Sequence, residues 1–117
     1  MDNSLNLIND EFESEGIHLV CLNKGKVVGV GRLNIENETS VISQMAIEKS
    51  LQTHGIGTKI VKELIRYSKE KNIAKIELSA RETAIAFYEK FDFLALGNKY
   101  PSNKTGIIHQ KMVLKIE

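Results

Sequence analysis

The 117-residue chain is short of several features, and each shortage excludes a class of protein. Its one cysteine, Cys21, has no partner for an internal disulfide and lies in an apolar run, where a small buried side chain is expected. One proline, no tryptophan and 42% hydrophobic residues give no sign of disorder. No apolar run approaches the ~18 residues of a membrane span, and the acidic, polar start lacks the pattern of a signal peptide. These absences predict a single cytoplasmic domain.

An excess of charge of one sign is missing too. The formal net charge is +1 and the lysines are scattered, so we expect no nucleic-acid partner. The three histidines and the cysteine lack metal-ligand spacing, so we expect no metal. The run 29–34, GVGRLN, lacks the third glycine of a dinucleotide fingerprint, and the chain has neither a P-loop nor a Gly-x-Ser-x-Gly turn.

The hydrophobic periodicity predicts an α+β fold, with a mixed, mostly antiparallel sheet flanked by helices. Residues 1–16 are expected to form a loose N-terminal arm with a short helical turn over 5–12, and residues 17–117 the folded domain. Asn72 is expected to end the longer helix in the left-handed conformation. The expected strands are 17–22, 26–34, 39–47, 73–79, 93–96 and 107–116, and the expected helices 57–71 and 82–91.

The most informative segment runs from Gln52 to Thr58, between the strand 39–47 and the longer helix. The first amides of a helix have no internal partner, and the helix dipole adds positive charge there. Gly55 and Gly57 would let a phosphate approach the backbone closely. A bare G-x-G is common by chance, and two glycines kept for tight packing are the alternative. The strand before and the helix after favour a phosphate or pyrophosphate site.

Three short motifs, in order along the chain, carry a further signal. Residues 52–57 read QTHGIG, which matches the pattern Q/R-x-x-G-x-G/A between a strand and a long helix. Residues 84–93 read AIAFYEKFDF and match a late helix of pattern A-x-x-F/L-Y-x-K-x-G-F, with Asp92 in place of the glycine. Residues 106–112 read GIIHQKM, similar to a G-x-P-H-x-x-M strand. Over about residues 17–117 the chain therefore resembles the GNAT family of acyl-CoA-dependent N-acyltransferases, in its small bacterial branch.

The resemblance implies an enzyme that transfers acetyl from acetyl-CoA to a small primary amine by direct attack. Acyl-CoA would lie where the strands 39–47 and 73–79 splay apart, its pantetheine arm paired with the main chain of Met45, Ala46 and Ile47. Plain core packing of these side chains is compatible with that role. The pyrophosphate would lie on the turn residues, which are Gln52, Thr53, His54, Gly55, Ile56, Gly57 and Thr58.

The resemblance also gives roles to a few side chains. Tyr88 matches the family's usual general acid, since a phenol with a pKa of about 10 can protonate a nearby thiolate; a tyrosine packed on the sheet is the alternative. No general base is obvious. Glu48 follows the pantetheine strand, Gln44 could hold a water, and His109 could face the acceptor. Arg32 could attract an anionic substrate, and a structural role is the alternative for it and for His109.

The front of the chain departs from the family. Its members begin with a strand and two helices, which need about 28 residues, and the second helix usually lines the acceptor pocket; 16 residues are available here. We therefore expect most of this piece to be absent. A non-catalytic acyl-CoA-binding or protein-interaction module of the same fold is the alternative function. A sheet edge left open by a missing first strand favours a homodimer. Asp92 ends a helix where the left-handed conformation is common and tolerated by Asp.

Overall fold

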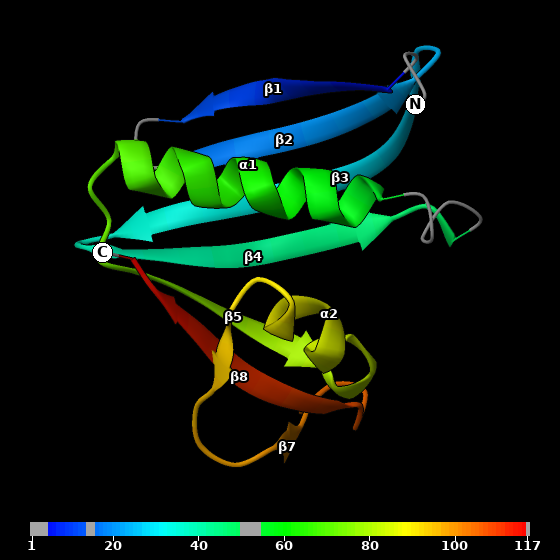
Figure 1. Ribbon diagram of the computed structural model, residues 1–117. Helices are drawn as coiled ribbons and strands as arrows, with labels where there is room; N and C mark the ends of the chain where they lie inside the picture. The colour runs from blue at the N-terminus through cyan, green and yellow to red at the C-terminus, as the bar shows by residue number, and fades with distance from the viewer. Residues whose placement is uncertain (1–4, 14–15, 50–54, 117) are drawn as a thin grey trace.

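The computed structural model describes residues 5–13, 16–49 and 55–116, which form one mixed sheet with α1 and α2 on the same face (Figure 1). The strand order is β1-β2-β3-β4-β5-β8-β6, and β7 pairs with β8. Among the described strands only β4 and β5 pair in parallel, which confirms the predicted fold class. The elements are β1 (Leu5–Glu13), β2 (Gly16–Asn23), β3 (Lys26–Glu36), β4 (Thr39–Ile47), α1 (Ile56–Glu70), β5 (Lys75–Arg81), the 3₁₀ turn η2 (Glu82–Ala84), α2 (Ile85–Glu89), β6 (Leu94–Ala95), β7 (Tyr100–Pro101) and β8 (Ile108–Lys115).

A strand occupies Leu5–Glu13, so the loose arm with a helical turn predicted within 1–16 is wrong over this stretch. This strand, β1, pairs antiparallel with β2 from end to end. Leu5 and Leu7 stand at alternate positions, as in a strand, and pairing with β2 outweighs the polar, acidic composition. The expectation that most of the first strand is absent is therefore wrong as well.

The connection between β1 and β2 leaves no room for helices, because β1 ends at Glu13 and β2 begins at Gly16. The departure from the family is thus confined to the pair of helices. β1 is the outermost strand on this side of the sheet. The sheet therefore still ends in an edge strand at the place where a second copy was expected to pair. Dimerisation stays a prediction.

Glycines on β3 let α1 lie close to the sheet. A Cβ atom at Gly29 would come within 2.9 Å of Ile56 Cγ2, and one at Gly31 within 2.4 Å of Ile60 Cγ2. Real Cβ atoms do not approach other atoms so closely, and packed interiors leave little room to adjust. The two glycines that cannot serve a dinucleotide site therefore serve helix packing. Four apolar side chains of α1 are buried in the resulting core, namely Ile56, Ile60, Val61 and Leu64.

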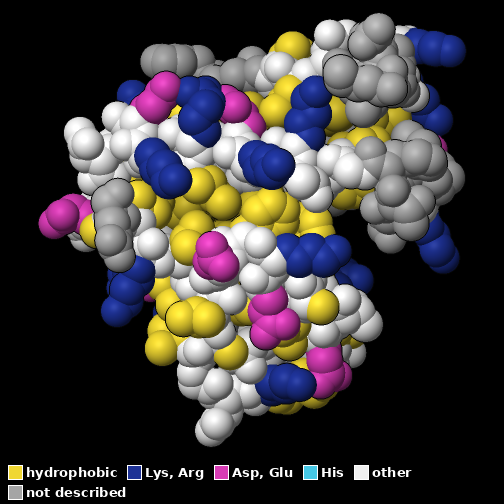
Figure 2. Space-filling view, in the orientation of Figure 1, with side chains coloured by type: hydrophobic (Ala, Val, Ile, Leu, Met, Phe, Trp, Pro, Cys, Tyr) yellow, Lys and Arg dark blue, Asp and Glu magenta, His cyan; other side chains and the backbone are white. Residues whose placement is uncertain are grey.

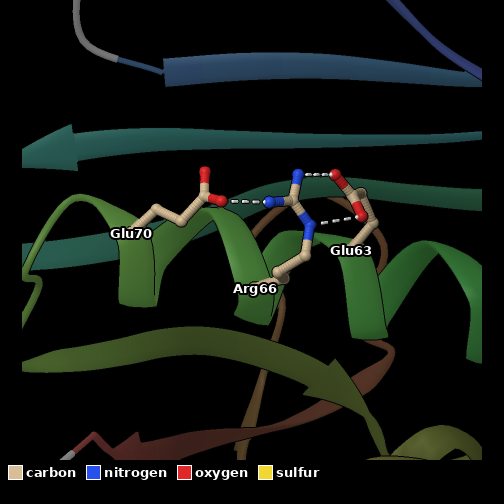
Figure 3. Close-up of polar contacts among 3 residues, drawn as sticks. All are labelled: Glu63, Arg66 and Glu70. Carbon is tan, nitrogen blue, oxygen red and sulfur yellow. Dashed lines mark hydrogen bonds and ion pairs between the residues drawn. The ribbon is translucent and has the colours of Figure 1, made fainter.

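The far side of α1 is polar and faces solvent. Arg66 donates from Nε to Glu63 Oε1 at 2.9 Å and from Nη1 to Glu70 Oε2 at 2.5 Å, with a further contact from Nη2 to Glu63 (Figure 3). The hydrogen bond with Arg66 lowers the pKa of the Glu63 carboxyl. Exposed pairs of this kind add little stability, so the buried face of α1 holds the helix in place. Asn72, at φ 58°, ends the helix segment in the predicted left-handed conformation.

The second half of the sheet carries the shorter helix. The helix predicted over 82–91 begins as a 3₁₀ turn and continues as α2. Asp92 follows with φ 71°, the left-handed conformation expected at this position. Strand β5 extends to Arg81, beyond the predicted end at Ser79.

Candidate active site

Strands β4 and β5 pair only at their first residues, from Thr39↔Lys75 to Val41↔Glu77, and then diverge (Figure 1). Strand β4 continues to Ile47 beyond the last pair. A register shift against β3 at Ser43 bends β4, while β5 stays paired with β8 to its end. The strands therefore splay apart beyond Val41, as expected from the resemblance.

Two adjoining cavities occupy this opening. One, of about 510 Å³, lies on the helix-covered face between β4, the first turn of α1 and α2. The other, of about 210 Å³, passes between β4 and β5. Met45, Arg81, Ala84 and Tyr88 line both, so the two cavities adjoin each other. Figure 2 shows hydrophobic side chains in the hollow between the α1 and α2 halves of this face.

Tyr88 lies on α2 at the junction of the two cavities. It is 7% exposed, and its ring makes edge contacts with Phe87 and Phe93 at centroid distances of 5.0 and 5.8 Å. Burial raises the pKa of Tyr88 to about 12. The hydroxyl therefore stays protonated, and remains a hydrogen-bond donor, across the physiological range. The ring is part of the core, and the side chain also lines both cavities. Core packing is therefore compatible with a catalytic role for the hydroxyl.

The glycine turn leads directly into the larger cavity. Gly55 has φ 78°, and α1 begins at the next residue. A Cβ atom at Gly57 would lie 3.1 Å from Phe87 Cζ, so this glycine also brings α1 close to α2. Ile56 is buried in the core and Thr58 is half-buried. The amides of the first turn point out of the helix, while Gly57 lines the same cavity as the predicted pantetheine residues, which are Met45, Ala46 and Ile47.

Gln52, Thr53 and His54 fall outside the described residues. Glu48 pairs with Lys26 at 3.5 Å, past the end of β4, and lines neither cavity.

Gln44 and Arg32 are cross-strand partners on β4 and β3. Gln44 lines the cavity between β4 and β5, and its role in holding a water stays a prediction. Arg32 lines neither of the two cavities.

The face of the sheet opposite the helices carries a polar cluster at the same opening. Ser79 alternates with buried neighbours on β5 and lines the smaller cavity. Its Oγ lies 2.7 Å from the hydroxyl oxygen of Tyr100 on β7. The Tyr100 ring stacks on His109, with centroids 6.0 Å apart, and His109 lines the smaller cavity as well. Three strands thus place polar groups on the side away from α2.

Sequence reasoning missed Arg81, Ser79 and Tyr100. Arg81 lines both cavities and lies opposite His109 in the β5–β8 register. Its position at the end of a strand, just before a helix, is a signal that could have found it. The described residues contain no group of three His, Cys, Asp or Glu side chains arranged to hold a metal. None of the helices in the described ranges has the length and apolar character needed to span a membrane.

Known proteins resemble the chain in sequence and in fold. The family described as "Acetyltransferase (GNAT) domain" matches residues 3–116. The uncharacterized N-acetyltransferase YjcF of Bacillus subtilis (strain 168) is 29% identical over 104 residues, which cover 89% of this chain and 74% of YjcF.

Solved structures share the fold at lower identity. A GNAT family acetyltransferase from Elizabethkingia anophelis, with acetyl-CoA bound, has a TM-score of 0.79 and 13% identity, covering 97% of this chain and 99% of that one. The ribosomal-protein-S18-alanine N-acetyltransferase of Escherichia coli has a TM-score of 0.78 and 20% identity, covering 91% and 72%. At these identities the likeness shows the fold. Because the family match spans nearly the whole sequence, the chain is a member of the GNAT acetyltransferase family.

Proposed function

We propose that this chain transfers the acetyl group of acetyl-CoA to the amino group of a small primary amine by direct attack. The divergence of β4 from β5 after Val41↔Glu77 carries the proposal, because it leaves one side of β4 open beside a cavity of about 510 Å³. Family membership supports the reaction class. A fold neighbour from Elizabethkingia anophelis holds acetyl-CoA, and one from Bacillus subtilis is a complex with CoA.

The pantetheine arm would lie along β4. Amide and carbonyl groups of Met45, Ala46 and Ile47 would pair with the amides of the arm as an added strand would. Side-chain identity matters little for such contacts. All three residues line the larger cavity, which the first turn of α1 borders through Gly57.

The pyrophosphate would bind at the start of α1, on the segment from Gln52 to Thr58. First-turn amides and the helix dipole attract an anion. The first turn of α1 contains no acidic side chain that would repel it. The left-handed Gly55 turns the chain into the helix without a side chain between backbone and phosphate.

Tyr88 would act on the leaving sulfur. A neutral amine attacks the thioester carbonyl carbon, the N–C bond forms, and the C–S bond breaks with its electron pair on sulfur. Because the pKa of Tyr88 is raised to about 12 and that of a thiol is about 8.5, complete proton transfer from this phenol is uphill. The Tyr88 hydroxyl is therefore better suited to donate a hydrogen bond to the developing thiolate, which takes its proton from solvent.

One observation favours a second candidate, a non-catalytic acyl-CoA-binding or interaction module. β1 and β2 are joined without the two helices expected of the family, the second of which usually lines the acceptor pocket. Such a module would bind acetyl-CoA or a protein and release no CoA. Turnover with an amine therefore separates the two candidates.

The test combines calorimetric titration with acetyl-CoA and a thiol-release assay over a panel of primary amines. Gly55→Val places a branched side chain at positive φ in the phosphate turn, and Gly25→Val does the same, at φ 82°, in the β2–β3 turn. We expect Gly55→Val to weaken acetyl-CoA binding at least about tenfold and Gly25→Val to leave it unchanged. Absence of saturable binding to the unaltered chain at millimolar acetyl-CoA would overturn the proposal.

A further inference from the structure

We propose that His109 is the general base, and that it takes the amine proton on the face of the sheet opposite the helices. The inference rests on the proposed acetyl transfer. His109 lines the cavity between β4 and β5, and it also lines a hollow of about 420 Å³ that is bordered by Tyr100 and the loop 101–104. An amine that enters from this hollow reaches the opening past the imidazole.

The imidazole has one nitrogen engaged. Nδ1 of His109 lies 3.0 Å from the carbonyl oxygen of Ile107. A carbonyl oxygen only accepts hydrogen bonds, so Nδ1 carries the hydrogen in the neutral ring. Nε2 then holds a lone pair, which is what a base requires. The stacked Tyr100 ring, anchored through its hydroxyl to Ser79 at 2.7 Å, limits rotation of the imidazole.

His109 and Tyr88 approach the same cavity from opposite sides. Tyr88 belongs to α2, on the helix-covered face, and lines the cavity assigned to acetyl-CoA. His109 belongs to β8, where it alternates with the buried Gln110, and it lines the hollow on the other face. Both line the 210 Å³ passage between β4 and β5. The sheet thus separates the group that accepts the amine proton from the group that stabilises the leaving thiolate.

The described carboxylates near the opening are less suited to the task. Glu77 is held by Lys75 at 3.1 Å and by Lys111 at 3.4 Å, and these contacts lower the pKa of Glu77. Glu48 lies beyond the end of β4, paired with Lys26. Among the described residues lining the passage and the hollow, His109 is the one side chain of a type that exchanges protons near neutral pH.

The charged and titratable groups around His109 come from each neighbouring element. Arg81 is its partner on β5, Tyr100 its partner on β7, Lys111 follows two residues along β8, and Lys104 lines the hollow from the loop. None of these four groups is a carboxylate that could take the amine proton in place of His109. The carboxylate on the neighbouring η2, Glu82, is paired with Lys99 at 2.9 Å and lines neither the passage nor the hollow.

The proton step balances without a further reactant. As the amine nitrogen bonds to the carbonyl carbon, one N–H proton passes to His109 Nε2, directly or through one water. The C–S electron pair goes to sulfur, which Tyr88 stabilises. The imidazolium then returns its proton to solvent, and the thiolate takes one from solvent. The products are the N-acetyl amine and CoA.

The test uses His109→Gln, with His18→Gln on β2 as the matched control. The amine panel contains an amino alcohol, a diamine, an aromatic amine and an amino acid amide. The probe is the amine with which the unaltered chain releases CoA fastest. We expect His109→Gln to lower kcat about 10²-fold to 10³-fold and to change the pH profile of kcat. Its affinity for acetyl-CoA should stay within about twofold (~0.4 kcal/mol) of the unaltered chain, which also verifies folding. His18→Gln should retain the rate and the pH profile.

Two further measurements test the assignment of His109 as the base. Added imidazole should restore part of the activity of His109→Ala, and nitrogen-15 NMR should find the proton of neutral His109 on Nδ1. A normal rate and pH profile in His109→Gln, or the proton on Nε2, would overturn the base assignment while leaving acetyl transfer intact. If the unaltered chain binds acetyl-CoA but none of the amines in the panel makes it release CoA, acetyl transfer and the base assignment are overturned together.

Discussion

Strand β4 pairs with β3 from Glu36↔Thr39 to Gly29↔Ile47, but its pairing with β5 ends at Val41↔Glu77. On the β3 side, glycines bring α1 close, and a ladder that runs the length of β4 with one register shift at Ser43 holds the backbone. On the β5 side, the strands diverge around two adjoining cavities. The same strand thus contributes a rigid edge to the scaffold and an open edge to the site. The pairing with β3 therefore holds the backbone of β4 in place where its other side faces the cavities.

The largest expected effect comes from breaking the β3 side. Gly31→Val would place a branched side chain where a Cβ already meets Ile60 Cγ2 at 2.4 Å. We expect a loss of about 3 kcal/mol in the free energy of unfolding, because the packed core adjusts poorly to added atoms. Urea unfolding measures it. Gly25→Ala meets no atom within 4 Å of the new Cβ, and its positive φ of 82° alone should cost about 1 to 2 kcal/mol. Equal losses would mean that α1 does not need the glycine on β3.

The next largest effect is expected on the β5 side, at Tyr88. Tyr88→Phe removes the hydroxyl at the junction of the two cavities and keeps the ring in its aromatic contacts. We expect kcat to fall about 10²-fold, or about 2.7 kcal/mol in the barrier. Acetyl-CoA affinity should change little. Steady-state kinetics with calorimetry separates the two quantities, and an unchanged kcat would remove Tyr88 from the mechanism.

The raised pKa of Tyr88 also predicts a pH dependence of stability. The phenol ionises near pH 10 in the unfolded chain and at about 12 in the folded one. Between these values the unfolded state binds fewer protons, so stability falls as pH rises. At pH 11 the loss from this group is about 1.4 kcal/mol. Chemical denaturation from pH 9 to 11.5 measures it: Tyr88→Phe should lose this slope, and the exposed Tyr100→Phe should keep it.

An effect of similar size concerns the paired start of β4 and β5. Ser40 on β4 and Ser68 on α1 are fully buried, with their hydroxyl oxygens 2.9 Å apart. We expect Ser40→Ala to cost about 1 to 2 kcal/mol, because it leaves the other hydroxyl unsatisfied. The double variant with Ser68→Ala should cost less than the sum of the two single ones. Additive losses would mean that the pair makes no interaction worth measuring.

Local chemistry made part of the structure predictable. The left-handed Asn72 and Asp92 follow from residue type at a helix end, and the helix after Gly55 follows from periodicity. β1 escaped prediction because its acidic composition hides a short alternation of leucines, and only pairing with β2 makes it a strand.

The candidate site was predictable to a different degree. The opening at Met45 was expected from the resemblance, since no local signal says where two parallel strands stop pairing. The cluster of Ser79, Tyr100 and His109 could not be predicted, because it depends on the register of three strands far apart in sequence. Its members come together only when β8 pairs with β5 on one side and with β7 on the other.

The most direct test of the open edge is residue-resolved amide hydrogen exchange of β4, with and without acetyl-CoA. The account predicts that amides within Met45–Ile47 that point away from β3 gain protection when acetyl-CoA binds. Amides of β3 that already bond to β4 should change little. Unchanged exchange at Met45–Ile47, in a chain shown by calorimetry to be saturated with acetyl-CoA, would contradict the account, because the ligand would then bind without using the open side of β4.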